Sequence, residues 1–122
     1  MKRIAIIDDE ELILDSVKQY LSRSKRFKID TFSNPQEALK EVLRAKYKLI
    51  VLDIMMPELN GIDFLKMIKK EVPQTKVIMM TAYSTLDKAI LSKEIGADDY
   101  LTKPFVSLRD VENKVLDCLE IH

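Results

Sequence analysis

The sequence predicts an α/β protein with a doubly wound, five-stranded parallel sheet, (βα)5, in the strand order 2-1-3-4-5. Short apolar runs alternate five times with segments of helical periodicity, which is typical of βα units joined by right-handed crossovers. The apolar runs are uninterrupted, as in strands that are covered on both faces. At 122 residues and 14.2 kDa the chain is long enough for one hydrophobic core. We therefore expect a single domain over residues 1–122.

The first two predicted strands differ in character. The apolar run 4–7 predicts a buried strand, and after it Ile13, Val17 and Leu21 are spaced four apart, as on one face of a helix. Residues 27–32 alternate only weakly between apolar and polar side chains, which predicts a strand at the edge of the sheet.

The second helix has a clear start. Asn34 is a good N-cap residue, Pro35 suits the first helical position, and Glu37 suits the first turn. Its expected buried face consists of four apolar residues: Ala38, Leu39, Val42 and Leu43. The run 49–52 then predicts a third, buried strand.

The remaining elements follow the same alternation. A loop with Pro57, Asn60 and Gly61 precedes a third helix with core residues Phe64, Leu65 and Ile68, which ends before Pro73. Residues 77–80 predict the fourth strand and residues 84–95 the fourth helix, with Gly96 as its C-terminal stop. Residues 100–101 predict a short fifth strand. Ser107 and Asp110 resemble a capping box for the last helix, whose core-facing residues are Leu108, Val111, Val115 and Leu119.

Composition excludes several kinds of chemistry. A single cysteine, Cys118, permits neither an internal disulfide nor a zinc–cysteine cluster. The only histidine, His122, is the last residue, which argues against Ser-His-Asp catalysis and histidine-ligated metals. Two glycines are too few for a glycine-rich phosphate loop. The 20 basic and 20 acidic side chains balance, which argues against direct binding of nucleic acid or membranes.

Four of the five predicted strands end in polar side chains. Asp8 and Asp9 follow the first strand, and the third, fourth and fifth strands end at Asp53, Thr81 and Lys103, respectively. In a doubly wound sheet these ends share one edge, and ligands bind there where the strand order reverses. Each residue taken alone is more simply a solvated loop residue or a helix cap. The agreement of four strand ends favours a functional site.

The residue types at this edge suggest phosphoryl chemistry. Three carboxylates repel one another unless a cation lies among them, and a ligand set made of oxygen alone favours Mg²⁺. Asp53 stands alone at the end of the central strand, which makes it the best candidate for a nucleophile that forms an aspartyl-phosphate. Lys103 and the Thr81 hydroxyl could each stabilise a phosphoryl oxygen.

Four segments together resemble the receiver domain of two-component response regulators. They are residues 4–10 (IAIIDDE), 52–57 (LDIMMP), 81–83 (TAY) and 96–105 (GADDYLTKPF). The match covers essentially the whole chain, in the usual order and spacing. The resemblance implies a flavodoxin-like fold of the chemotaxis-regulator type and a cytoplasmic protein.

The resemblance also implies specific roles. Asp53 would accept a phosphoryl group from a phosphohistidine of a sensor histidine kinase or phosphotransfer protein. Thr81 and Tyr100 would form a switch pair, and Lys103 would contact the phosphoryl group. The peptide bond between Lys103 and Pro104 would be cis. Mg²⁺, for which Mn²⁺ could substitute, would be bound by Asp8, Asp9, Asp53 and the backbone carbonyl of Met55.

Two side chains suggest a slow loss of the phosphoryl group. In this family the positions two beyond the acceptor and two beyond the switch threonine border the phosphoryl group, and here they are Met55 and Tyr83, with Ala82 beside the latter. A nearly apolar methionine and a bulky tyrosine are poorly suited to orient an attacking water. We therefore expect a signalling domain with slow self-dephosphorylation rather than an enzyme with steady turnover.

Partners and alternatives follow from the same residues. We expect a downstream output domain or protein, with the fourth helix, fifth strand and fifth helix as the surface that binds it. Homodimerisation on phosphorylation could use the same surface. An aspartyl-phosphate phosphatase would carry a second aspartate as general acid where this chain has Met55. A flavin-binding module would need a phosphate loop rich in glycine and hydroxyls, where residues 8–11 read DDEE.

Overall fold

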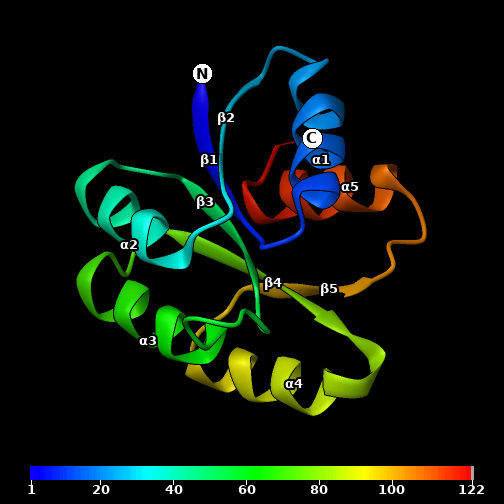
Figure 1. The fold of residues 1–122 in the computed structure, drawn as a ribbon. Coiled ribbons are helices and arrows are strands. Elements are labelled where there is room, and N and C mark those ends of the chain that lie inside the picture. Colours follow the sequence, from blue (N-terminus) through cyan, green and yellow to red (C-terminus); the bar gives the residue numbers. More distant parts are fainter. Residues whose placement is uncertain (122) are drawn as a thin grey trace.

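Strands and helices alternate along the chain in this computed structural model, which describes residues 1–121 (Figure 1). The strands are β1 (Lys2–Ile7), β2 (Phe27–Phe32), β3 (Leu49–Asp53), β4 (Lys76–Ala82) and β5 (Asp99–Lys103). The helices are α1 (Glu11–Ser22), α2 (Pro35–Arg44), α3 (Gly61–Glu71), the 3-10 turn η1 (Tyr83–Thr85), α4 (Leu86–Ile95) and α5 (Leu108–Cys118).

All five strands are parallel and lie in the order β2-β1-β3-β4-β5, which confirms the predicted fold class and places residues 27–32 at an edge. Ile7 pairs with Leu52, and Ala82 pairs with Lys103. The carboxyl ends of neighbouring strands are therefore in register along one edge of the sheet.

Helices cover both faces of this sheet. Helices α2, α3 and α4 pack on one face, with Val42, Phe64 and Ala89 in the core. Helices α1 and α5 lie together on the other face, with Val17 and Val115 buried (Figure 1). Because β1, β3 and β4 are covered on both sides, their apolar runs are fully buried, as the sequence predicts.

Side-chain caps position three of the helices. The Asn34 side chain accepts hydrogen bonds from the backbone N–H groups of Gln36 and Glu37 at 2.8 and 3.1 Å, as predicted for the start of α2. The Asn60 side chain accepts from the N–H of Ile62 at the start of α3. The third cap is at the start of α5, where Ser107 Oγ accepts a hydrogen bond from the N–H of Asp110.

Two expectations about helices are wrong. Leu43 is 39% exposed, because Ala38 and Val42 face the sheet and Leu43 lies about 100° further round the helix. The fourth helix begins at Leu86 rather than residue 84, because residues 83–85 form a 3-10 turn. Gly96 ends this helix with a φ of 133°, as expected for its stop.

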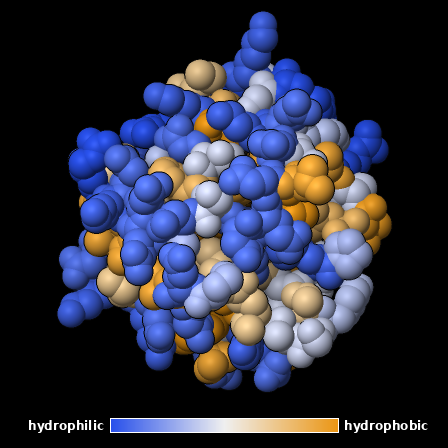
Figure 2. All heavy atoms as spheres, in the orientation of Figure 1, coloured by the Kyte–Doolittle hydropathy of each residue, from blue (hydrophilic) through white to orange (hydrophobic). Residues whose placement is uncertain are grey.

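The face of the molecule seen in Figure 2 is mostly hydrophilic. Apolar side chains gather at the right of that view, where Figure 1 places the start of α1 and the chain between β5 and α5. Leu12 and Val106 are among the exposed large apolar residues of the molecule. Within residues 1–121, no helix combines the length and apolarity needed to cross a membrane.

Candidate functional site

Side chains from three strand ends meet at the carboxyl edge of the sheet. The ammonium group of Lys103, at the end of β5, lies 2.8 Å from Asp8 Oδ2 and 3.3 Å from Asp53 Oδ2. Asp8 follows β1, and Asp53 is the last residue of β3. The predicted convergence of Asp8, Asp53 and Lys103 is therefore present in the structure.

Burial gives these charges their unusual properties. Asp8 is fully buried, and Asp53 is 4% exposed. Burial, followed by the negative charge of Asp8, raises the pKa of Asp53 to about 6, against the opposing effect of Lys103. Burial also raises the pKa of Asp8, and the hydrogen bond from Lys103 offsets only part of that rise.

Lys103 stays charged in this surrounding. Burial alone lowers the pKa of Lys103, but the hydrogen bond to Asp8 and the charge of Asp53 outweigh it, so that the pKa is raised overall. The peptide bond between Lys103 and Pro104, expected to be cis, is cis. The site thus holds one partly buried cation between two buried carboxyl groups.

A second group of acids lies at the mouth of the site. Asp8, Asp9 and Glu10 can each present a carboxylate oxygen such that all three oxygens lie within 4.8 Å of one another. Asp9 and Glu10 are exposed, and Glu10 also reaches Lys103 at 3.4 Å. The expected position of Asp9 near Asp8 is thus present, whereas the participation of Glu10 was not predicted from the sequence.

The backbone around Asp53 is held firmly. The N–H of Met55 donates to Asp53 Oδ1 at 3.1 Å, and the N–H of Ile54 donates to the carbonyl of Met80 at 3.0 Å. Gly61, the first residue of α3, approaches this segment so closely that an added Cβ would lie 2.5 Å from the carbonyl oxygen of Asp53. Only glycine fits there, because the obstructing atoms are backbone.

The Thr81 hydroxyl is directed away from this cluster. It contacts Ala82, the last residue of β4, and Thr85 in the following turn η1, with no hydrogen bond to Asp53 among residues 1–121. Thr81 therefore lies at the predicted strand end, but its hydroxyl is not turned toward the acceptor in this arrangement.

Tyr100 is half-buried on β5. The Lys114 ammonium lies 5.3 Å from the centroid of its ring and donates to the Tyr100 carbonyl at 2.9 Å. Tyr100 and Lys114 line a surface cavity of about 470 Å³ against α5. The aromatic ring thus lies at the edge of the sheet, between the core covered by α2, α3 and α4 and Lys114 of α5.

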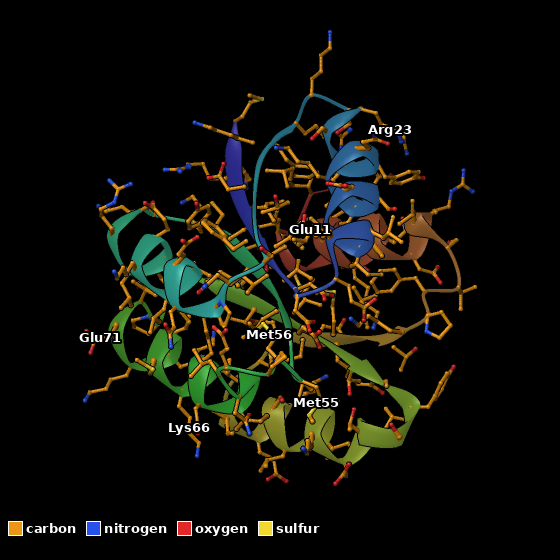
Figure 3. All side chains as sticks on the ribbon, viewed as in Figure 1. Glu11, Arg23, Met55, Met56, Lys66 and Glu71 are labelled. Carbon is orange, nitrogen blue, oxygen red and sulfur yellow. The ribbon has the colours of Figure 1, made fainter. Side chains whose placement is uncertain are left out.

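The residues that were expected to border the phosphoryl group are exposed. Met55 is 50% exposed and Tyr83 is 66% exposed, and Ala82 is also exposed. Figure 3 shows Met55 above α4 and Met56 nearer the centre of the molecule, where it is buried. Lys88 of α4 reaches Met55, with its Nζ 3.3 Å from the sulfur atom.

Sequence reasoning did not identify Glu10, Thr85 or Lys88 as neighbours of the site. Glu10 directly follows Asp8 and Asp9 in the sequence, so the run of three acidic residues could have indicated that it lies near the site. Thr85 and Lys88 come close only through the geometry of the 3-10 turn and α4, which periodicity did not resolve.

Known proteins are similar to this chain in sequence and in fold. The family described as response regulator receiver domain matches residues 4–115. The alkaline phosphatase synthesis transcriptional regulatory protein PhoP of Bacillus subtilis (strain 168) is 40% identical over 114 residues, covering 93% of this chain and 47% of PhoP. The transcriptional regulatory protein SrrA of Staphylococcus aureus (strain NCTC 8325) is 41% identical over 112 residues, covering 92% of this chain and 45% of SrrA.

A solved structure agrees closely with this fold. The CheY-like response regulator receiver domain protein from Methanospirillum hungatei JF-1 superposes with a TM-score of 0.90 at 34% identity, over 98% of this chain and 94% of that one. The present chain spans about half the length of the curated relatives PhoP and SrrA. The chain belongs to the response regulator receiver domain family.

Proposed function

We propose that Asp53 accepts a phosphoryl group from a phosphohistidine and that the domain changes conformation in response. The observation that carries this proposal is the buried Asp53 carboxylate with the Lys103 ammonium 3.3 Å away. A pKa of about 6 leaves Asp53 mostly ionised at pH 7, so that it can act as a nucleophile.

The transfer step forms one bond and breaks one. A carboxylate oxygen of Asp53 attacks the phosphorus, the P–N bond to the histidine breaks, and its electron pair returns to the imidazole nitrogen. Lys103 is positioned to donate a hydrogen bond to a phosphoryl oxygen, and the Met55 N–H already orients the carboxylate. No second aspartate follows at position 55, so a general acid for rapid turnover is lacking there.

The residues at the mouth of the site fit a hard divalent cation. Asp8, Asp9 and Glu10 offer closely spaced carboxylate oxygens. Burial raises the pKa of Asp8 and, together with the charge of Asp8, the pKa of Asp53, so a bound cation would favour the ionised form of both carboxyl groups. We propose that Asp8, Asp9, Asp53 and the Met55 carbonyl bind Mg²⁺ or, in its place, Mn²⁺. Bound there, the ion would neutralise negative charge on the carboxylates and the phosphoryl oxygens.

The switch involves Thr81 and Tyr100. A phosphoryl group brings about −1.5 to −2 charges and strong acceptor oxygens. We propose that the Thr81 hydroxyl turns to donate to one of them, and that Tyr100 moves from its place beside Lys114 into the space vacated by Thr81. The surface formed by α4, β5 and α5 then changes for an output domain, a partner protein or a second copy.

We propose that residues 1–122 form one receiver domain, that its donor is a sensor histidine kinase or phosphotransfer protein, and that it does not itself bind nucleic acid. For this role we expect a cytoplasmic location, which fractionation of cells would test.

Labelling with acetyl phosphate in the presence of Mg²⁺ tests the central proposal. Wild-type protein should reach about one phosphoryl group per chain, and Asp53→Asn should abolish labelling. Asp63→Asn, which alters an exposed carboxylate on α3, is the matched control and should label normally. Steady release of phosphate without accumulation would indicate a phosphatase, and labelling that persists in Asp53→Asn would contradict the acceptor assignment.

A further inference from the structure

We propose that Thr85 is a positioning residue that holds the Thr81 hydroxyl in its present arrangement and so opposes its movement toward Asp53. This inference rests on the proposed phosphoryl-accepting function. It adds a residue that lies outside the acidic cluster, on the 3-10 turn that leads into α4.

Contacts of the Thr81 hydroxyl carry the proposal. Thr81 Oγ1 lies 3.1 Å from the carbonyl oxygen of Thr85 and 3.2 Å from that of Ala82, and it also contacts Thr85 Oγ1. Thr85 Oγ1 in turn lies 3.1 Å from the Ala82 carbonyl. When Thr85 donates to Ala82, Thr81 donates to Thr85, so the two hydroxyls form a closed set of partners within residues 81–85.

Burial makes release of this hydroxyl unfavourable. Thr81 is 1% exposed, so bulk water does not replace the partners that it would leave. A buried hydroxyl that has no hydrogen-bond partner destabilises the folded protein, because it has been removed from water without a replacement for its hydrogen bond. The Thr81 hydroxyl therefore leaves Thr85 only for another acceptor, such as an oxygen of a phosphoryl group on Asp53.

The place of Thr85 at the helix start supports the same role. Thr85 is the N-cap residue of α4, and threonine is favoured there because its hydroxyl can accept from N–H groups of the first turn. Here the side chain makes no such cap hydrogen bond. The hydroxyl faces Thr81 and Ala82 instead, so its contacts serve the switch threonine rather than the helix end.

A charged acceptor can compete with this arrangement. Hydrogen bonds to charged acceptors are roughly twice as strong as neutral ones. A phosphoryl oxygen therefore outcompetes Thr85 for the Thr81 hydroxyl, but the net gain is reduced by the contacts that are lost. Removal of the Thr85 hydroxyl should make the phosphorylated arrangement easier to reach.

Binding of beryllofluoride, a phosphoryl mimic, measures this effect. We would titrate wild type, Thr85→Val, Thr85→Ser and Ser84→Ala at fixed Mg²⁺ and follow bound fluoride by ¹⁹F NMR. Thr85→Val keeps the shape and loses the hydroxyl, so the Thr81 hydroxyl keeps only its longer contacts with the carbonyl oxygens of Ala82 and Thr85. The variant should bind the mimic about three- to tenfold more tightly, as expected for one net hydrogen bond. Thr85→Ser, which restores the hydroxyl, should return to within about twofold of wild type.

Two controls separate this role from a general structural effect. Ser84 is an exposed hydroxyl residue in the same turn, with no side-chain hydrogen bond among residues 1–121, so Ser84→Ala should match wild type. In a Thr81→Ala background, Thr85→Val should no longer change the affinity, because the hydroxyl that Thr85 holds is absent. If Thr81→Ala does not fold, the comparison of Thr85→Val with Thr85→Ser still decides.

The outcomes distinguish the role of Thr85 from the proposed phosphoryl-accepting function. Unchanged or weaker binding by Thr85→Val, or a gain that persists in Thr81→Ala, would overturn the role of Thr85 alone. Absence of Asp53-dependent beryllofluoride binding in the wild type would overturn the proposed function itself.

Discussion

The Lys103 ammonium donates a hydrogen bond of 2.8 Å to the carboxylate of Asp8, which is fully buried, although the two residues are separated by most of the chain. This pair joins the end of β5 to the end of β1 across the intervening strands β3 and β4. Lys103 thus stabilises the acidic edge of the sheet in addition to its proposed contact with a phosphoryl group.

Removal of this cation should destabilise the fold. Lys103→Met leaves Asp8 and Asp53 buried without their partner, and breaking a buried pair from one side costs about 3 kcal/mol. Urea unfolding at pH 7 in EDTA should show a loss of that order, which becomes smaller at pH 5 as the carboxyl groups take up protons. Lys76→Met, which breaks a partly exposed pair with Asp98, is the matched control and should cost less than about 1 kcal/mol. Equal losses in the two variants would contradict the importance of burial.

The pKa of Asp53 predicts how stability varies with pH. The native pKa is about 6 and the ordinary value is 3.8, so between these values the folded protein keeps a proton that the unfolded chain has lost. The free energy of unfolding should therefore fall as the pH rises through this window and remain low above it. The raised pKa of Asp8 acts in the same direction.

Asp53→Asn should remove this contribution. At pH 7 in EDTA the variant should be more stable than wild type by roughly 3 kcal/mol, with a flatter dependence between pH 4 and pH 6. Asp63→Asn should follow the wild-type curve, because its carboxylate is exposed. A stability that rises with pH across the window in wild type would show that the carboxyl pKa is depressed instead.

Addition of Mg²⁺ should stabilise the protein by linkage. A ligand that binds only the folded state at ten times its Kd contributes about 1.4 kcal/mol, which corresponds to roughly 5 °C in Tm for a domain of this size. The shift should be lost in Asp9→Asn, whose carboxylate is exposed and lacks the structural ties of Asp8. No shift at millimolar Mg²⁺ in wild type would count against the proposed metal site.

Much of the fold followed from the sequence because its signals are local. The buried runs of β1, β3 and β4 and the cap at Asn34 are set by residue type and spacing, and each agrees with the structure. The prediction that Leu43 is buried was wrong, because an apolar residue of a helix can lie at the flank of the buried face. Its burial depends on how the helix is rotated against the sheet.

For the site, the sequence predicted which residues come together but not how all of their side chains are oriented. Strand-end positions identified Asp8, Asp53 and Lys103, because the carboxyl ends of parallel strands all lie at one edge of the sheet. The orientation of the Thr81 hydroxyl was not predictable, since it depends on the 3-10 turn that brings Thr85 beside it. The close approach of Gly61 to the Asp53 backbone likewise requires the packing of α3 against β3.

The lifetime of the proposed aspartyl-phosphate should depend on Met55 and Tyr83. Both side chains are exposed at the rim, and neither is suited to orient a water for attack on the phosphorus. We expect loss of the phosphoryl group from wild type to be slow, and a lifetime of seconds would contradict this. Met55 also has the Lys88 ammonium at its sulfur, so a substitution there leaves a cation beside the site.

Met55→Asn should shorten this lifetime by about tenfold, because an amide can orient a water without taking its proton, whereas a positioned general base would supply 100-fold or more. Tyr83→Ala should act in the same direction by admitting water. Decay of the acyl phosphate in purified protein measures both variants against Met67→Asn, which alters a partly exposed methionine on α3. If Met67→Asn shortened the lifetime as much as Met55→Asn, the effect would come from general destabilisation rather than from water access at the phosphoryl group.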